Sequence, residues 1–99
     1  MHTYALHEYF RANSWAREQL GAYQDESGQY YFDCLVGFRK CSASDWGRLG
    51  DLYRAELESV DRGFGKLIGA VEEAGEVRET YFLLVSDHGE GFDPGSFAP

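Results

Sequence analysis

The residues best suited to metal chemistry lie near the C-terminus, in the sequence Ser-Asp-His-Gly-Glu at residues 86–90. Asp87 offers a short oxygen ligand and His88 a nitrogen ligand, and Gly89 allows the backbone to turn sharply after them. Neither Asp87 nor His88 is a natural packing residue, since an unpaired buried carboxylate is costly. The alternative is that Asp87 caps a following helix while His88 lies in a solvated turn. Spacing alone does not separate these two interpretations, because short motifs often match by chance.

The elements before this motif would place it at the edge of a sheet. Residues 80–85, Thr-Tyr-Phe-Leu-Leu-Val, form an apolar run without alternation, which is typical of a parallel strand covered by helices on both faces. An amphipathic helix is predicted over residues 42–75, with Ser44 as its N-cap and Gly75 at its end. Its apolar stripe comprises Leu49, Leu52, Tyr53, Leu57, Val60, Phe64, Leu67, Ile68 and Val71. Helix, short connector and buried strand make half of a βαβ unit, and ligands bind outside the carboxyl ends of such strands.

The first 41 residues are less regular. Residues 1–7 predict the end of a strand, and a helix is expected from about Glu8 to Leu20. Its expected buried positions are Phe10, Trp15 and Leu20. Residues 29–38 are rich in Tyr, Phe, Leu and Val, and this pattern is compatible with either a short strand or a helix.

Composition narrows the classes of partner. The chain has 99 residues and a net charge of −8, of which −7 falls in residues 42–99, with twelve acids and five bases. An acidic surface of this kind argues against nucleic-acid binding. No stretch reaches the ~20 apolar residues that span a membrane. Cys34 and Cys41 could form a disulfide, but their spacing fits no metal motif, and free thiols or packing roles are the favoured interpretation.

Several features in order resemble one family. Residues 52–61 carry a Tyr, Glu and Asp helix, and residues 65–68 read Gly-Lys-Leu-Ile. They are followed by the Thr-led apolar run and by the motif at residues 86–90. This order closely resembles the sulfatase family of the alkaline phosphatase superfamily. Residues 2–9 also resemble the sulfatase segment in which a strand ends in a His ahead of an aromatic residue, although Glu8 replaces the usual Pro.

The resemblance implies a fold and a set of site residues. The fold would be α/β, a fragment of an alkaline-phosphatase-like sandwich with helices covering a mostly parallel sheet. Residues 1–99 would form a partial domain, with a strand, helix and connector on the substrate side (1–41) and the helix, strand and metal loop (42–99). Asp87 and His88 would bind a divalent cation, and His7 would contact the substrate sulfate. The family favours calcium, whereas the nitrogen of His88 suits manganese or zinc.

The nucleophile expected of a sulfatase is missing from the sequence. The family uses a formylglycine made from Cys or Ser in Cys/Ser-X-Pro-X-Arg, and neither Cys34 nor Cys41 begins such a motif. The chain is therefore expected to be an internal fragment that requires the remainder of the domain and is inactive alone. The implied reaction is hydrolysis of a sulfate ester of a small molecule or carbohydrate.

Two alternatives stay open at this point. The first is a phosphoester or phosphonate hydrolase, or a phosphoglycerol-type transferase, of the same superfamily, because related hydrolases of phosphorus esters carry Asp-His. The second is a small non-catalytic binding protein, which would fold cooperatively on its own.

Overall fold

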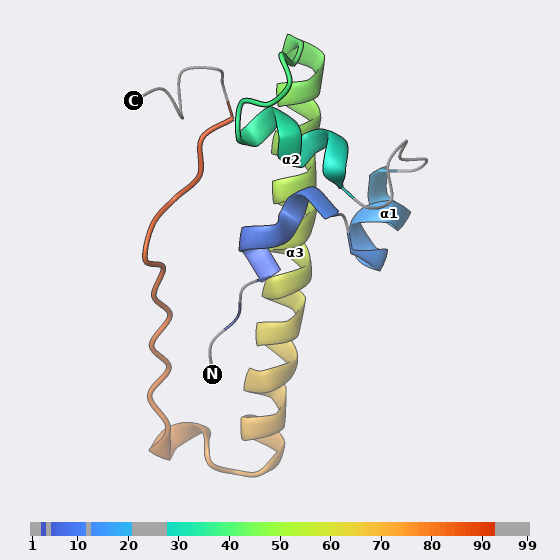
Figure 1. Ribbon diagram of the computed structural model, residues 1–99. Helices are drawn as coiled ribbons and strands as arrows, with labels where there is room; N and C mark the ends of the chain where they lie inside the picture. Colours follow the sequence, from blue (N-terminus) through green and yellow to red (C-terminus); the bar gives the residue numbers. More distant parts are fainter. Residues whose placement is uncertain (1–2, 4, 12, 21–27, 93–99) are drawn as a thin grey trace.

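The computed structural model describes residues 3, 5–11, 13–20 and 28–92. Within them lie two 3-10 helices and three α-helices: η1 (Ala5–Arg11), α1 (Ser14–Leu20), α2 (Gln29–Leu35), α3 (Ala43–Glu73) and η2 (Val77–Glu79). Figure 1 shows the shorter elements arranged along α3, which is the axis of the molecule. The radius of gyration is 16.4 Å, compared with about 13 Å for a compact domain of this length. The molecule is elongated because α3 extends along nearly the whole of its long dimension.

Both ends of α3 are set by local hydrogen bonds. The N-cap is Ser42, two residues before the predicted Ser44. Its hydroxyl accepts from the Asp45 N–H at 3.1 Å, and the Asp45 carboxylate accepts from the Ser42 N–H at 2.8 Å. This capping box needs an acidic or amide residue three positions after the cap, which Asp45 supplies for Ser42. At the other end Gly75 has φ 73° and its N–H donates to Glu72, as expected of the residue that ends a helix.

The predicted helix over residues 8–20 is divided in two. η1 contains a kink at Glu8 and ends at Arg11, and α1 begins after Asn13. The Asn13 side-chain oxygen accepts from the Ala16 N–H at 2.8 Å, which caps α1 and starts a new helical direction. Further along, α2 resolves the ambiguity of residues 29–38 in favour of a helix.

Close packing between η1 and α2 requires a glycine at position 28. Gly28 has φ +76°, and a Cβ there would lie 2.8 Å from the Phe10 carbonyl oxygen. Only glycine allows both the left-handed backbone and this approach. The Gly28 backbone thereby brings α2 against η1.

The core lies between the short helices and the first half of α3. Tyr9, Leu49 and Leu52 are its largest fully buried side chains. The full cluster comprises Tyr9, Phe10, Ala16, Cys34, Trp46, Leu49, Leu52 and Ala55. One charged residue, Glu56, is also buried, at 6% exposure. Phe10 is therefore buried as predicted, Trp15 is half-buried with the Arg62 guanidinium 3.9 Å from its ring centroid, and the Leu20 side chain lies outside what the structure describes.

The predicted α/β sandwich is wrong for the described part of the chain, which contains helices and no strand. Residues 80–85 are extended but unpaired, and Tyr81 is fully exposed while Leu83 is 89% exposed. The predicted buried strand is therefore a solvent-exposed segment. An apolar run can become a parallel strand only when neighbouring strands pair with its backbone and helices cover both faces.

The predicted strand at residues 1–7 is also wrong for its described residues 5–7. Ala5, Leu6 and His7 belong to η1, while residues 1, 2 and 4 lie outside the described part. None of the described helices combines the length and apolar character needed to cross a membrane.

Candidate metal-binding site

The loop that carries Asp87 and His88 is held by contacts on either side of it. After Gly75 the chain reverses direction through η2, and the extended segment then runs back beside α3 (Figure 1). Before the loop, Phe82 packs edge-on against Phe64 of α3, with ring centroids 6.1 Å apart. After it, Phe92 packs against Tyr9 of η1 at 5.8 Å and Tyr53 of α3 at 5.2 Å. These aromatic contacts return the chain to the core within four residues of His88.

Short hydrogen bonds shape the loop itself. The Ser86 hydroxyl donates to the His88 carbonyl oxygen at 2.7 Å. The His88 ring Nδ1 lies 2.7 Å from the Gly89 carbonyl oxygen, and because a carbonyl can only accept, Nδ1 must carry the proton. Neutral His88 therefore has its lone pair on Nε2, which is the form that binds a metal.

Asp87 and His88 present their donor atoms close together. Asp87 Oδ1 lies 3.8 Å from His88 Nε2, and the two side chains are 92% and 69% exposed. Ligands that share one cation at roughly 2.0–2.6 Å lie about 3–4 Å apart, so this separation fits a shared cation. Two exposed donors without further ligands make a weak site, because most cations in proteins take four or more ligands.

The surroundings of His88 favour its charged form. The Gly89 carbonyl, and then the Asp87 and Glu90 carboxylates, raise the pKa of the His88 imidazole. Each of these groups stabilises the charged imidazolium, which must lose its Nε2 proton before a metal can bind there. The same negative charge also attracts a cation, so the loop is electrostatically suited to positive charge of either kind.

His7 lies on the element that the loop approaches. It is exposed on η1, two residues before Tyr9, which contacts Phe92. Burial raises the pKa of the Tyr9 hydroxyl, and the negative charge of Glu90 raises it further, which places Glu90 near that hydroxyl. The described residues show no hydrogen bond or ion pair between His7 and Asp87 or His88. The structure thus brings the two segments together without joining the three predicted side chains.

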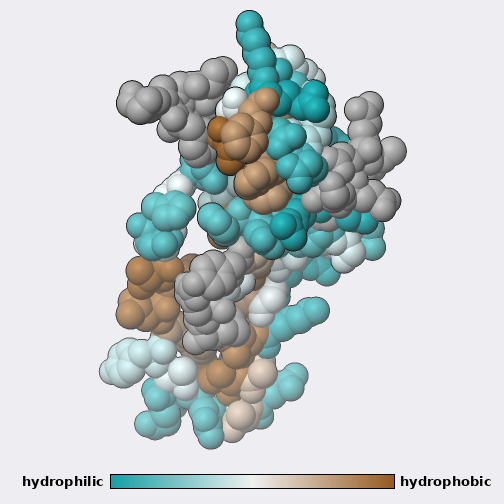
Figure 2. All heavy atoms as spheres, viewed as in Figure 1, coloured by the Kyte–Doolittle hydropathy of each residue, from teal (hydrophilic) through white to brown (hydrophobic). Residues whose placement is uncertain are grey.

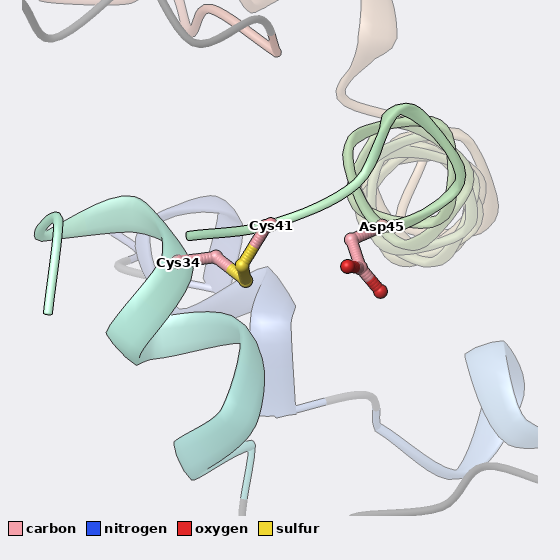
Figure 3. Close-up of side chains that lie close together, drawn as sticks. All are labelled: Cys34, Cys41 and Asp45. Atoms are coloured by element: carbon pink, nitrogen blue, oxygen red, sulfur yellow. A yellow bond between two sulfur atoms is a disulfide. The ribbon is translucent and has the colours of Figure 1, made fainter. Parts of the chain in front are cut away.

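A second group of potential ligands was not predicted from the sequence. Cys34 and Cys41 form a disulfide instead of the expected free thiols. Asp45, in the first turn of α3, lies beside them, and the potential ligand atoms of the three residues are all within 4.8 Å of one another (Figure 3). The signal in the sequence was a cysteine directly before the Ser42 capping box. This signal identifies a group of ligands only once the structure places α2 beside the start of α3.

In its disulfide form this group is not a thiolate site. Both sulfur atoms are engaged with each other, and the thiolate is the form of cysteine that binds metals. The Asp45 carboxylate accepts hydrogen bonds from the Ser42 N–H and hydroxyl, and these bonds hold its pKa below the usual range. Its role here is to cap α3.

Comparison with known proteins assigns the family. The model of the Sulfatase family matches residues 1–98, nearly the whole chain. The chain belongs to the sulfatase family. Searches of curated proteins and of solved structures returned no match.

Sulfatase-family proteins generally use a divalent metal. Asp87 and His88 fit this chemistry through their adjacent oxygen and nitrogen donors and through the free Nε2 lone pair of His88. Neither Cys34 nor Cys41 of this sulfatase-family chain begins a Cys-X-Pro-X-Arg sequence, and the two residues form a disulfide.

Proposed function

We propose that this sulfatase-family chain supplies cation-binding and substrate-binding residues for the hydrolysis of sulfate esters. The observation that carries the proposal is the match of the family over residues 1–98 together with the 3.8 Å separation of Asp87 Oδ1 and His88 Nε2. Asp87 and His88 would hold the cation. When bound, a divalent cation supplies positive charge that stabilises the sulfuryl oxygens as negative charge develops on them.

His7 would bind the sulfate group of the substrate. A histidine N–H donates a hydrogen bond to an anionic oxygen, and His7 is exposed on the element that the loop approaches through Phe92 and Tyr9. In this proposal His7 orients the ester and does not transfer a proton. The attacking group is not assigned to any residue of this chain, so the chain alone is expected to show no arylsulfatase turnover.

The proposal can be tested by observing where a paramagnetic cation binds. Mn²⁺ added to the ¹⁵N-labelled chain should broaden the amide signals of residues 86–90 first, because it relaxes nearby nuclei. Asp87→Asn and His88→Gln should each weaken this selective broadening at least tenfold in Mn²⁺ concentration, as loss of one of two ligands requires. Asp61→Asn is the matched control, because it removes an exposed acid of α3 outside the loop, and it should leave the broadening unchanged.

Two results would contradict the proposal. One is equal broadening at all acidic positions, which would show diffuse attraction of the cation to a chain of net charge −8. The other is selective broadening that survives both substitutions. Turnover of an aryl sulfate by the isolated chain would contradict the separate claim that it lacks the nucleophile.

A phosphorus ester is the second candidate substrate, favoured by one observation. The residue after Asp87 is His, as in the related phosphate and phosphonate ester hydrolases, and not Asn. Binding of phenyl sulfate and phenyl phosphate to the Mn²⁺-loaded chain distinguishes the two. Sulfate specificity predicts that the sulfate ester binds at lower concentration in a calorimetric titration, and His7→Gln should remove that difference.

A further inference from the structure

The Cys34–Cys41 disulfide has the carboxylate of Asp45 beside it, which a purely structural cross-link does not require. Cys34 is buried in α2 at 3% exposure, and Cys41 is half-buried in the segment that enters α3. Asp45 reaches the same place from the first turn of α3 (Figure 3). All three potential ligand atoms are within 4.8 Å of one another. The disulfide therefore has a carboxylate beside it and joins a buried cysteine to a half-buried one.

We propose that reduction of this disulfide converts Cys34, Cys41 and Asp45 into a binding site for a divalent cation of the zinc class. The reductant is a dithiol, which gives two electrons and two protons to the disulfide and becomes a cyclic disulfide itself. Two protein thiols result. Binding of the cation then releases their two protons and leaves two thiolates and one carboxylate as ligands. Water would complete a four-coordinate shell.

The geometry suits this conversion. The Cα atoms of Cys34 and Cys41 are 5.7 Å apart. Two thiolates on one tetrahedral zinc, at about 2.3 Å each, lie roughly 3.7 Å apart, so the sulfur atoms must separate but the backbone need move little. Cys41 lies between α2 and α3, outside both helices, so its backbone is not fixed by helical hydrogen bonds when the sulfur atoms separate. Cys34 and Asp45 are held on their helices.

The charges around the group favour thiolates once the bond is open. The N-terminus of α3 directly follows Cys41, and helix N-termini stabilise negative charge. The Arg39 guanidinium lies 4.5 Å from the centroid of the Tyr30 ring, and the Tyr30 hydroxyl donates to Asp45 at 3.2 Å. The positive charge of Arg39 and of the α3 N-terminus repels a cation. The two thiolates and the carboxylate outweigh this repulsion, because they carry three negative charges and the cation carries two positive ones. Soft sulfur ligands select zinc-class cations over calcium or magnesium.

This site is independent of the proposed sulfatase function. It uses none of His7, Asp87 and His88, and it exists only in the reduced chain. A cation bound at residues 86–90 would be held by oxygen and nitrogen, whereas this one would be held by sulfur. The two sites therefore differ in spectroscopic signature and can be tested separately.

Cadmium is a direct probe because its thiolate complexes absorb in the ultraviolet by charge transfer. The full chain would be reduced with a dithiol, freed of it by anaerobic gel filtration, and titrated with Cd²⁺. A thiolate band that saturates at one equivalent is expected for the reduced chain and no band for the disulfide form. Zn²⁺ in large excess should compete with Cd²⁺ and lower the band, whereas the same excess of Ca²⁺ should not.

Substitutions identify the ligands. Cys41→Ser should abolish the one-equivalent band, and Asp45→Asn should weaken Cd²⁺ binding at least tenfold. Asn at position 45 keeps a side-chain acceptor for the α3 cap, and circular dichroism would verify that helix content is retained. Asp51→Asn, on the next turns of α3, is the matched control. The Asp87→Asn/His88→Gln chain should keep the band in full.

Three outcomes would overturn the proposal. They are a reduced chain without a saturable band, a band of equal strength in Cys41→Ser, and an unchanged affinity in Asp45→Asn with its helix content intact. Loss of the band in the Asp87→Asn/His88→Gln chain would also overturn it, because the cation would then belong to the loop.

Discussion

The two halves of α3 share one sequence pattern and have different surroundings. The apolar stripe continues from Leu49 to Val71. In the first half, Leu49 and Leu52 are fully buried where η1 and α1 pack on α3, whereas in the second half no residue of the stripe is buried and Leu67 is 40% exposed. Figure 2 shows apolar surface gathered over the lower part of α3 and the neighbouring extended segment. A helix of uniform amphipathicity thus has a core along one half and an open apolar face along the other.

This difference shows what each half contributes. The first half, with the short helices, carries the stability of the chain through the core cluster and the disulfide. The second half and residues 80–92 carry the predicted metal loop and touch the core mainly through Phe92. The exposed side chains of residues 81–85 and Leu67 thus gain little from burial in this part of the molecule. The candidate metal loop therefore lies in the part of the molecule that contributes little to the stability of the fold.

The largest expected effect compares one leucine from each region. Leu52→Ala should lower the free energy of unfolding by about 2–5 kcal/mol, because it leaves a cavity under η1. Leu83→Ala should change it by less than about 0.5 kcal/mol, since that side chain is 89% exposed. Urea unfolding followed by circular dichroism would measure both. Equal effects would mean that residues 80–85 are packed in solution and that the two regions do not differ.

Removal of the disulfide should weaken only the packed region. Cys34→Ser/Cys41→Ser opens a short loop and should cost about 2–3 kcal/mol of unfolding free energy. Hydrogen exchange should become faster in α2 and the first turns of α3, and it should stay fast and unchanged in residues 80–90. Faster exchange in the C-terminal segment as well would show that the two regions unfold together.

The capping box should have a smaller effect. Ser42→Ala removes the side-chain acceptor for the Asp45 N–H and should cost about 1 kcal/mol. Ser44→Ala is the matched control, because Ser44 is the N-cap predicted from the sequence but lies one residue inside α3. Thermal unfolding of both variants would decide between the two positions, and a larger loss for Ser44→Ala would contradict the observed cap.

The smallest expected effect lies where the core ends, at Glu56. Burial raises the pKa of this carboxyl above its ordinary value of 4.5, and a hydrogen bond with Asn13 opposes the rise. The folded state therefore binds the Glu56 proton more tightly than the unfolded state. Its contribution to stability is most favourable below pH 4.5 and falls as the pH rises through the raised pKa.

Glu56→Gln should remove this pH dependence. At neutral pH it should raise the free energy of unfolding by up to about 1 kcal/mol, because an uncharged amide is buried in place of a carboxylate and can still bond to Asn13. Chemical unfolding at pH 4 and pH 7 would measure the change. Glu58→Gln, an exposed neighbour, should leave both values unaltered, and an identical pH dependence in the Glu56 variant would refute the assignment.

Prediction from sequence succeeded where structure is local. The long helix and the role of Gly75 were predicted to within two residues, because capping and periodicity act over a few positions. The strand at residues 80–85 was not, because an apolar run becomes a strand only through pairing with distant segments. The division at Asn13 was missed for a local reason, since a single side-chain acceptor there outweighed the continuing helical pattern.

The candidate site shows the same limit. Asp87 and His88 were predicted from their order in the chain, and adjacent residues are necessarily close. His7 was predicted to contact the substrate sulfate, and this stays a prediction. Among the described residues its segment lies near the loop through Tyr9 and Phe92, without a hydrogen bond or ion pair from His7 to Asp87 or His88. Cys34, Cys41 and Asp45 could not be grouped from the sequence, because their proximity results from the packing of α2 on the start of α3.

The sequence alone was sufficient for the family and the amphipathic helix, and it supplied Asp87 and His88 as a prediction of the metal ligands. These depend on residue order and on interactions that span four residues or fewer. The tertiary structure decided which half of α3 is buried, that Cys34 and Cys41 are joined, and that residues 80–85 are exposed. The physical reason is that burial and cross-linking depend on which distant segments meet, and the chain entropy lost in bringing them together is recovered only where apolar surface can be covered.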